Sequence, residues 1–199
     1  MTGRTRKSAE ERKAEIIDSA LKLAAEVGPD RLTTEALARD IGISQPGIFR
    51  HFPRKDDIWE AVGMHISALL RENWANARLD DLPSDEKLQA FVISHLSFLQ
   101  ANPAIPAILF SRELHAENER LRSFFADLMK RVHRFLSELI VDVIRQGNFD
   151  AELDANDAAY LVLALIQGLV MRWSLSARKF NLVKEGERLL ALQLSGYRK

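Results

Sequence analysis

Apolar residues recur at intervals of three or four along almost the whole chain. Between residues 8 and 27, for example, the apolar positions are Ile16, Ile17, Ala20, Leu21, Ala24 and Val27. This spacing gathers them on one face of a helix, whereas a half-buried strand would alternate apolar and polar residues. No segment of strand length shows that alternation. The pattern therefore predicts an all-α protein of about nine helices.

Turn and capping residues set the limits of these helices. Gly28-Pro29 ends the first one, because glycine suits the position after a helix and proline cannot continue it. Ser44 and Ser84 are suitable N-caps for later helices. The helices are predicted at residues 8–27, 34–40, 44 onward, 55–77, 84–100, 102–114, 117–146, 154–178 and 184–194, with either Asp154 or Asn156 as the cap of the eighth. A boundary inside the long fourth helix predicts an N-terminal domain of residues 1–56 and a C-terminal domain of residues 57–199.

Residues 33–52 have the pattern of a helix-turn-helix. Two short helices joined by a turn at Gly42 place the second helix in the major groove of DNA. The apolar face that would hold their crossing angle consists of Leu37, Ala38, Ile41, Ile43, Ile48 and Phe52. Short or polar residues at the start of the second helix would let the backbone approach DNA: Ser44, Gln45, Pro46 and Gly47. Gln45 is the best candidate for reading a base edge, because its amide offers both a donor and an acceptor.

The same segment resembles the TetR/AcrR family of transcriptional regulators. The match runs in order and spacing through Gly28, Thr33-Thr34, Leu37-Ala38, residues 41–44 and residues 47–58. Its most diagnostic part is the His-Phe-x-x-Lys element at residues 51–55. The resemblance implies a homodimeric repressor that binds a palindromic, double-stranded DNA operator and responds to a small-molecule effector.

The resemblance also implies which residues meet DNA. Phosphate contacts are expected from Thr33, Thr34, His51 and Lys55. The position that usually holds tyrosine is Phe49, which would pack against sugar or a thymine methyl group, and Arg50 adds positive charge beside it. His51 could alternatively cap the neighbouring turn. The basic tail of residues 1–7 is either a minor-groove arm or a solubilising end, and both interpretations stay open.

Charge and composition narrow the function further. The chain has 28 basic and 28 acidic residues, but a protein's electrostatic field is local. Two groups of basic residues contain no acidic residue: Arg4, Arg6 and Lys7 before Glu10, and Arg50, His51, Arg54 and Lys55 after Gly42. There is no cysteine, no histidine pair at helical spacing and no glycine-rich phosphate loop. We therefore expect no metal, no cofactor and no enzymatic activity. The rivals are a helical enzyme or carrier with a vestigial helix-turn-helix, and an activator or ligand-blind architectural protein.

The location follows from the apolar segments. The basic start lacks the apolar centre of a secretory signal. The longest apolar run, from Ala158 to Met171, is shorter than the roughly 20 residues of a membrane span. We expect a cytoplasmic protein without a membrane role, which the lack of cysteine suits.

The apolar run from Ala158 to Met171 instead predicts a dimer. It is apolar almost all round its helix, so both faces need to be covered. The interface is expected from the last two helices, with Tyr160, Leu161, Leu165, Gly168, Leu169, Leu189 and Leu190. The alternative is a monomer in which this helix is central and buried.

A ligand site is expected between the fourth, fifth, seventh and eighth predicted helices. Its candidate residues are Trp74, Phe91, His95, Phe98, Phe125, Met129, Gln167 and Met171. Aromatic residues at helical spacing also fit an ordinary core. His95 and Gln167 are more informative, because burying an unpaired polar group costs roughly 1–3 kcal/mol. They predict a small, mainly apolar ligand with one or two polar groups, whose binding tilts the fourth helix and lowers affinity for the operator.

Overall fold

The computed structural model describes residues 7–76 and 82–198, so Arg4 and Arg6 of the basic tail lie outside the described residues. Within this part the chain forms ten α-helices, one 3-10 helix and no strand. In order they are α1 (Ala9–Val27), η1 (Pro29–Arg31), α2 (Thr34–Asp40), α3 (Gln45–Phe49), α4 (Lys55–Asn76), α5 (Ser84–Ala101), α6 (Ala104–Leu109), α7 (Arg112–Glu117), α8 (Glu119–Arg145), α9 (Ala155–Leu175) and α10 (Leu182–Ser195). The all-α class is confirmed.

Two details of the helix prediction were wrong. The segment predicted as one helix at residues 102–114 is divided into α6 and α7, which raises the number of helices from nine to ten. The break falls at Ser111, whose hydroxyl accepts a 3.0 Å hydrogen bond from the Leu114 N–H and caps α7. Ser84 is the first residue of α5 rather than its N-cap, because Pro83 occupies the cap. The Ser84 hydroxyl instead accepts a hydrogen bond from the Gln146 side chain.

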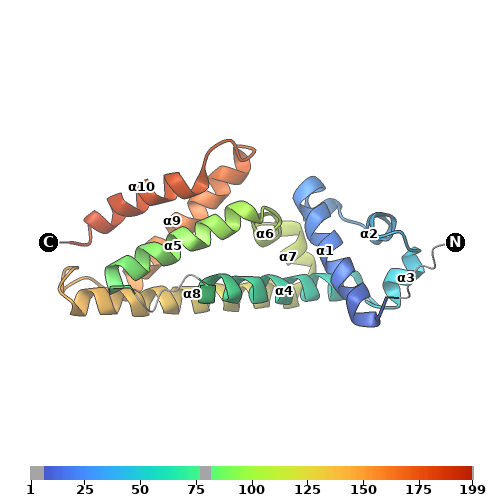
Figure 1. The fold of residues 1–199 in the computed structure, drawn as a ribbon, viewed down its shortest axis with the longest axis horizontal. Helices are drawn as coiled ribbons and strands as arrows, with labels where there is room; N and C mark the ends of the chain where they lie inside the picture. Colours follow the sequence, from blue (N-terminus) through green and yellow to red (C-terminus); the bar gives the residue numbers. More distant parts are fainter. Residues whose placement is uncertain (1–6, 77–81, 199) are drawn as a thin grey trace.

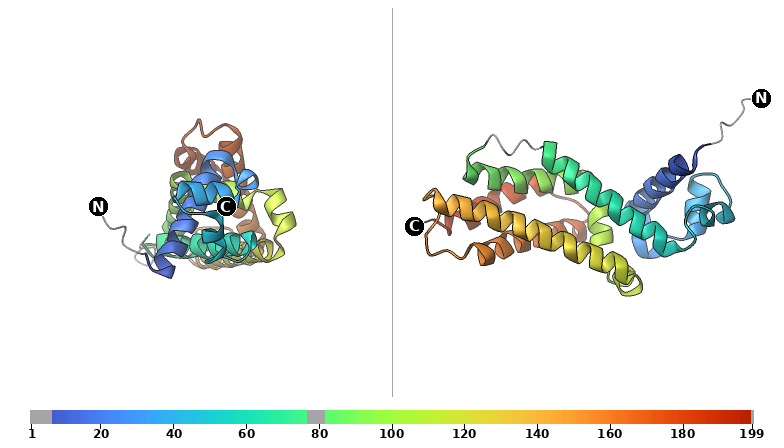
Figure 2. Two further views of the ribbon diagram at one scale, coloured as in Figure 1. Left: turned by 90° about the vertical axis from the view of Figure 1, so that its right-hand side faces the viewer. Right: turned by 90° about the horizontal axis from the view of Figure 1, so that it is seen from below.

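The molecule is elongated, with α1, α2 and α3 together at one end (Figure 1). α4 starts at this end and runs into the body, where it packs against α5 and α8. α8 also packs against α9, and α10 covers α5 and α9. The view from below shows α4 and α8 running along the length of the body (Figure 2). α4 is therefore a continuous element that joins the N-terminal end to the C-terminal helices.

The N-terminal end holds its helices around a small apolar core. Ile16 of α1, Leu37 of α2 and Ile48 of α3 are fully buried there. Gly42 lies between α2 and α3 with a φ of 68°, a left-handed conformation that glycine adopts without steric cost. α1 also packs against α4 and α6. Besides the chain connection through α4, the N-terminal end is therefore held to the body by the packing of α1 against α6.

Candidate DNA-binding surface, effector cavity and dimer face

The recognition helix α3 presents a mixed surface. Ser44, Pro46 and Arg50 are exposed, and the Phe49 side chain is 39% exposed. Gln45 is half-buried at the first position of the helix. On the opposite side, Ile48 and Phe52 anchor the helix in the core. The predicted division into an apolar inner face and a short polar outer face is present.

Two of the predicted DNA contacts are buried in this structure. A Cβ added to Gly47 would come within 3.2 Å of the Ile43 side chain, so this glycine allows close packing of the turn against α3. Thr34 is only 7% exposed, and its hydroxyl accepts a hydrogen bond from Gln45. Thr33 remains exposed and caps α2 by accepting a 3.1 Å hydrogen bond from the Ala36 N–H.

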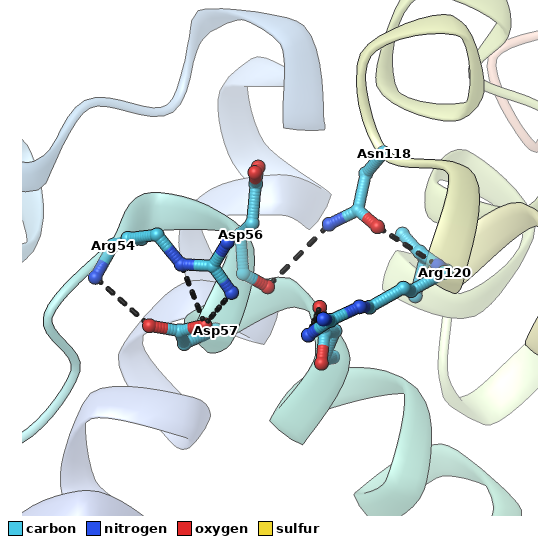
Figure 3. A network of polar contacts seen from close by, with 7 residues as sticks. Arg54, Asp56, Asp57, Asn118 and Arg120 are labelled. Carbon is cyan, nitrogen blue, oxygen red and sulfur yellow. Dashed lines mark hydrogen bonds and ion pairs between the residues drawn. The ribbon is translucent and has the colours of Figure 1, made fainter.

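Basic residues follow α3 at the start of α4. His51 and Lys55 are half-buried, and Arg54 is exposed. The Arg54 guanidinium lies 2.5 Å from the Asp57 carboxylate. The same carboxylate accepts a hydrogen bond from the Arg54 backbone N–H (Figure 3). The guanidinium contact makes the largest contribution, and together with the backbone hydrogen bond it holds the pKa of Asp57 below its ordinary value. Asp57 thereby fixes the first turn of α4 next to the recognition helix.

Polar contacts connect this turn to the C-terminal helices. The Asn118 side chain caps α8 and donates a 3.4 Å hydrogen bond to the Asp56 carbonyl (Figure 3). Arg120 forms a 3.5 Å ion pair with Glu60. On another side, the Ser111 hydroxyl donates a hydrogen bond to Asp30 in η1. These contacts place the starts of α7 and α8 directly against the DNA-binding end.

A narrow apolar cavity lies among the C-terminal helices. Its volume is about 30 Å³, which is room for one or two water molecules. The walls come from α4, α5, α6, α8 and α9, and include Ile66, Leu70, Leu99, Leu128, Val132 and Ile166. The predicted position between the fourth, fifth, seventh and eighth helices of the sequence pattern matches four of these five helices. The contribution of α6 was missed, although Ile105, Pro106 and Leu109 follow one another at helical spacing.

The predicted lining residues divide into two groups. Four of them line the cavity: His95, Phe125, Met129 and Gln167. The other four lie outside its wall: Trp74, Phe91, Phe98 and Met171. Trp74 and Phe91 instead pack their rings against His95, with centroids 6.0 Å apart in both pairs. Met171 is 37% exposed on the outer side of α9, because the register of the helix turns it away from the body.

The cavity wall contains polar groups with incomplete hydrogen bonding. The Nδ1 atom of His95 is buried and has no hydrogen-bond partner among the described residues. Burial lowers the pKa of His95 to about 4, so the ring is neutral at pH 7. Gln167 donates only a 3.5 Å hydrogen bond to the Met129 sulfur, a weak acceptor. A ligand with a polar group could therefore gain hydrogen bonds here without displacing strong ones.

The outer face of α9 carries exposed apolar side chains. Tyr160 and Leu161 are each 56% exposed and Leu175 is 80% exposed. Gly168 lies on this face, with open space where a Cβ would be. Two residues of the predicted interface, Leu169 and Leu190, are buried inside the subunit because they face the packing between α9, α10 and the body. Leu165 and Leu189 are half-buried, and Leu192 adds an exposed apolar side chain on α10.

α9 as a whole has the length and apolar composition of a helix that could cross a membrane. Its mean hydropathy reaches 1.5 over an 18-residue window, of which 44% is buried inside the protein. The core helices of soluble proteins pass the same test, which makes it weak evidence. The described residues contain no cluster of histidine, aspartate and glutamate suited to a metal ion.

Two family models match the chain on either side of a point within α4. Residues 16–62 match the model described as bacterial regulatory proteins, tetR family, and residues 63–196 match the YsiA-like protein, C-terminal region. The chain therefore belongs to the tetR family of bacterial regulatory proteins, as its helix-turn-helix predicted. It is a transcription regulator with a DNA-binding helix-turn-helix domain and a ligand-binding C-terminal domain.

Similar proteins include regulators solved with different ligands. Nucleoid occlusion factor SlmA of Salmonella typhi is 28% identical over 171 residues, which cover 85% of this chain and 86% of SlmA. FadR of Bacillus subtilis, solved with stearoyl-CoA, is 22% identical with a TM-score of 0.76 and covers 92% of this chain and 98% of its own. A transcriptional regulator of Saccharomonospora viridis, solved with choline, is 23% identical with a TM-score of 0.80 over 92% and 94% of the two chains. At these identities the solved structures show a shared fold, not a shared ligand.

Proposed function

We propose that this protein is a dimeric repressor that binds a palindromic operator and leaves it when a small, mainly apolar ligand enters the C-terminal cavity. The observation that carries the proposal is the course of α4. Its first residue, Lys55, lies just after the recognition helix, and its later residues Ile66 and Leu70 form part of the cavity wall. One helix thus joins the DNA-binding surface to the place where a ligand would bind.

The small volume of the cavity supplies a reason for the helix to move. With about 30 Å³ of space, the cavity has room for one or two water molecules, and a ligand with a long apolar chain would press on the surrounding helices. Movement of Ile66 and Leu70 would tilt α4 and shift Lys55 relative to the partner subunit. α6 offers a second route, because it lines the cavity and packs against α1. A ligand that binds only the displaced arrangement shifts the population towards it and lowers operator affinity.

Dimer formation is proposed through the outer face of α9. Tyr160, Leu161 and Leu175 present exposed apolar side chains there, and Gly168 leaves room for close approach of another helix. A two-fold dimer would carry two recognition helices about 34–36 Å apart, one turn of DNA, and so read a palindrome.

The proposed ligand class follows from the cavity wall. His95 and Gln167 are its hydrogen-bonding side chains, and the rest of the wall is apolar. The B. subtilis FadR structure with stearoyl-CoA supports a long apolar chain as the first probe. Choline, found with the S. viridis regulator, is a compact cation for which this wall offers no carboxylate. The cytoplasm remains the predicted location.

The test begins with selection of DNA from random duplexes by the purified protein. We expect a palindromic sequence to be enriched, with release of the protein by stearoyl-CoA or stearic acid and not by choline.

Leu161→Glu should give a monomer by sedimentation and lower operator affinity by about 100-fold or more, because the two half-sites lose their linkage. The matched control is Met64→Glu, which changes an exposed apolar residue of α4 outside the proposed interface. This variant should stay dimeric. Failure to enrich any DNA would favour the helical enzyme or carrier and overturn the proposal.

A further inference from the structure

The first residue of the recognition helix makes two hydrogen bonds within the free protein. The Gln45 Nε2 atom donates to the Thr34 hydroxyl at 2.8 Å and to the Glu35 carboxylate at 2.5 Å. A carboxamide nitrogen carries two hydrogens, so both of its donors are used. The orientation of the amide is set by Glu35, because an ionised carboxylate only accepts hydrogen bonds and therefore faces the nitrogen.

Both partners of this amide are held in place. Thr34 is 7% exposed and belongs to the packed side of α2. Glu35 is exposed, but hydrogen bonds from its own backbone N–H first, then from the Thr33, Gln45 and Thr34 side chains, hold its pKa below the ordinary value. Its carboxylate is therefore ionised at neutral pH and makes a charge-assisted hydrogen bond, roughly twice as strong as a neutral one.

The consequence is that Gln45 keeps only its carbonyl oxygen, Oε1, for DNA. A glutamine with a free amide reads adenine with two bonds, giving one to N7 and accepting one from N6. Here the donor half is already engaged by the protein. In the major groove, adenine N6 and cytosine N4 are donors, whereas guanine O6 and thymine O4 are acceptors. An acceptor-only glutamine therefore favours an amino base over a keto base.

We propose that Glu35 is a specificity-determining residue, which commits Gln45 to act as an acceptor and so selects adenine or cytosine over guanine or thymine at one position of each half-site. The inference rests on the proposed operator binding and adds a residue that the helix-turn-helix pattern did not single out. Glu35 acts through Gln45, so it is a positioning residue whose effect lies in base preference. The negative charge of Glu35 would lower the affinity for DNA of every sequence. The experiment therefore has to separate the effect of removing this charge from the loss of base preference.

The experiment compares base preferences of four proteins by selection from a random duplex pool followed by sequencing. They are the wild type, Glu35→Ala, Glu35→Gln and Gln45→Ala, with Glu10→Ala as a matched control. Glu10 is an exposed carboxylate of the same domain that pairs with Lys13 and does not touch Gln45. Its substitution removes the same charge and should change affinity evenly across sequences.

We expect the wild type to prefer amino bases at the position that Gln45 reads. In Glu35→Ala this preference should fall by about fivefold to tenfold, the discrimination typical of one base contact, and adenine should gain over cytosine because the two-bond contact becomes possible. Glu35→Gln, which replaces the ionised carboxylate with a neutral amide, should fall between the two. Thermal unfolding checks that each variant is folded.

Three results would overturn the inference in distinguishable ways. If Gln45→Ala abolishes the preference but Glu35→Ala leaves it intact, Glu35 does not orient the amide. If Gln45→Ala changes no position, Gln45 is not a base reader at all. If the wild type enriches no DNA, the proposed operator binding itself fails and the inference fails with it.

Discussion

The two domains differ in the hydrogen bonding of their buried polar side chains. In the DNA-binding domain, the buried Ser19 hydroxyl donates to Asp40 at 2.7 Å, and Asp40 also accepts from Lys22. In the C-terminal domain, buried nitrogen atoms of Trp74, His95 and His115 have no hydrogen-bond partner among the described residues. No buried side chain of the DNA-binding domain is left in that state within the described part of the chain. Among the described residues, the unpaired buried side-chain nitrogen atoms therefore all belong to the C-terminal domain.

This difference matches what each domain has to bind. Operator DNA is a polymer of fixed geometry, and a surface whose side chains already hold one another needs little rearrangement to meet it. The C-terminal cavity is narrow, and its polar side chains His95 and Gln167 have incomplete hydrogen bonding. The free form therefore carries an energetic cost of roughly 1–3 kcal/mol for each unpaired group. A ligand that satisfies such a group gains that energy on binding. The contrast leads to four predictions, ordered by the size of the expected effect.

The largest effect is expected from adding volume to the two interiors. Ala20→Leu at a fully buried position of α1 should lower the free energy of unfolding by about 1–3 kcal/mol, because extra methylene groups in a packed core force neighbouring side chains out of their preferred rotamers. Val132→Ile adds one methylene at the cavity wall and should be neutral or stabilise by up to about 0.8 kcal/mol. Urea denaturation of both variants measures the difference. Equal losses would show that the cavity is packed as tightly as the N-terminal core.

The second effect is a pH dependence that belongs to the C-terminal domain. The pKa of His95 is about 4 in the folded protein and about 6.5 in an unfolded chain. Between these values the unfolded state binds a proton that the folded state does not, so stability falls as the pH decreases. From pH 7 to pH 5 this should cost about 2 kcal/mol. In His95→Phe the free energy of unfolding should fall by about 2 kcal/mol less between pH 7 and pH 5, because the titrating group is gone. Urea denaturation at both pH values measures this difference.

The third prediction exchanges one buried polar group in each domain for an apolar one. His95→Phe removes the unpartnered nitrogen and keeps a ring against Phe91, so it should raise stability at pH 7 by about 1 kcal/mol. Ser19→Ala breaks a made hydrogen bond and should lower stability by about 1 kcal/mol. Thermal unfolding compares the two. A loss of stability in His95→Phe would mean that the histidine is already satisfied.

The smallest effect concerns the basic surface of this electrically neutral chain. Lys55→Ala should lower the slope of log affinity against log salt by about one, because one phosphate contact is lost. Arg131→Ala, at an exposed residue of α8, should leave the slope unchanged. Fluorescence anisotropy on the selected operator over a salt series measures both. An unchanged slope in Lys55→Ala would remove this lysine from the contact surface.

Periodicity and capping residues were enough to predict the all-α fold and the helix-turn-helix. They missed the break between α6 and α7, since residues 109–111 contain neither glycine nor proline and the Ser111 cap depends on Leu114 and Asp30. The candidate site was harder, because helical spacing identifies an apolar face without showing what lies opposite it. Met171 and Leu169 are two residues apart on α9, yet one is exposed and the other buried. The pairing of Gln45 with Glu35 depends on how α2 and α3 cross, which the sequence pattern does not determine.

Under the proposed mechanism, the small volume of the cavity would also set the ligand concentration at which the protein responds. If the ligand binds only an arrangement with displaced helices, its apparent affinity is the intrinsic affinity multiplied by the fraction of molecules in that arrangement. Substitutions that ease opening would make the regulator respond at lower ligand concentration without altering any ligand contact. In the same proposed mechanism, operator DNA favours the arrangement without displaced helices and so would act in the opposite direction. The dose at which a cell responds would then be set by the packing of helices around about 30 Å³ of empty space.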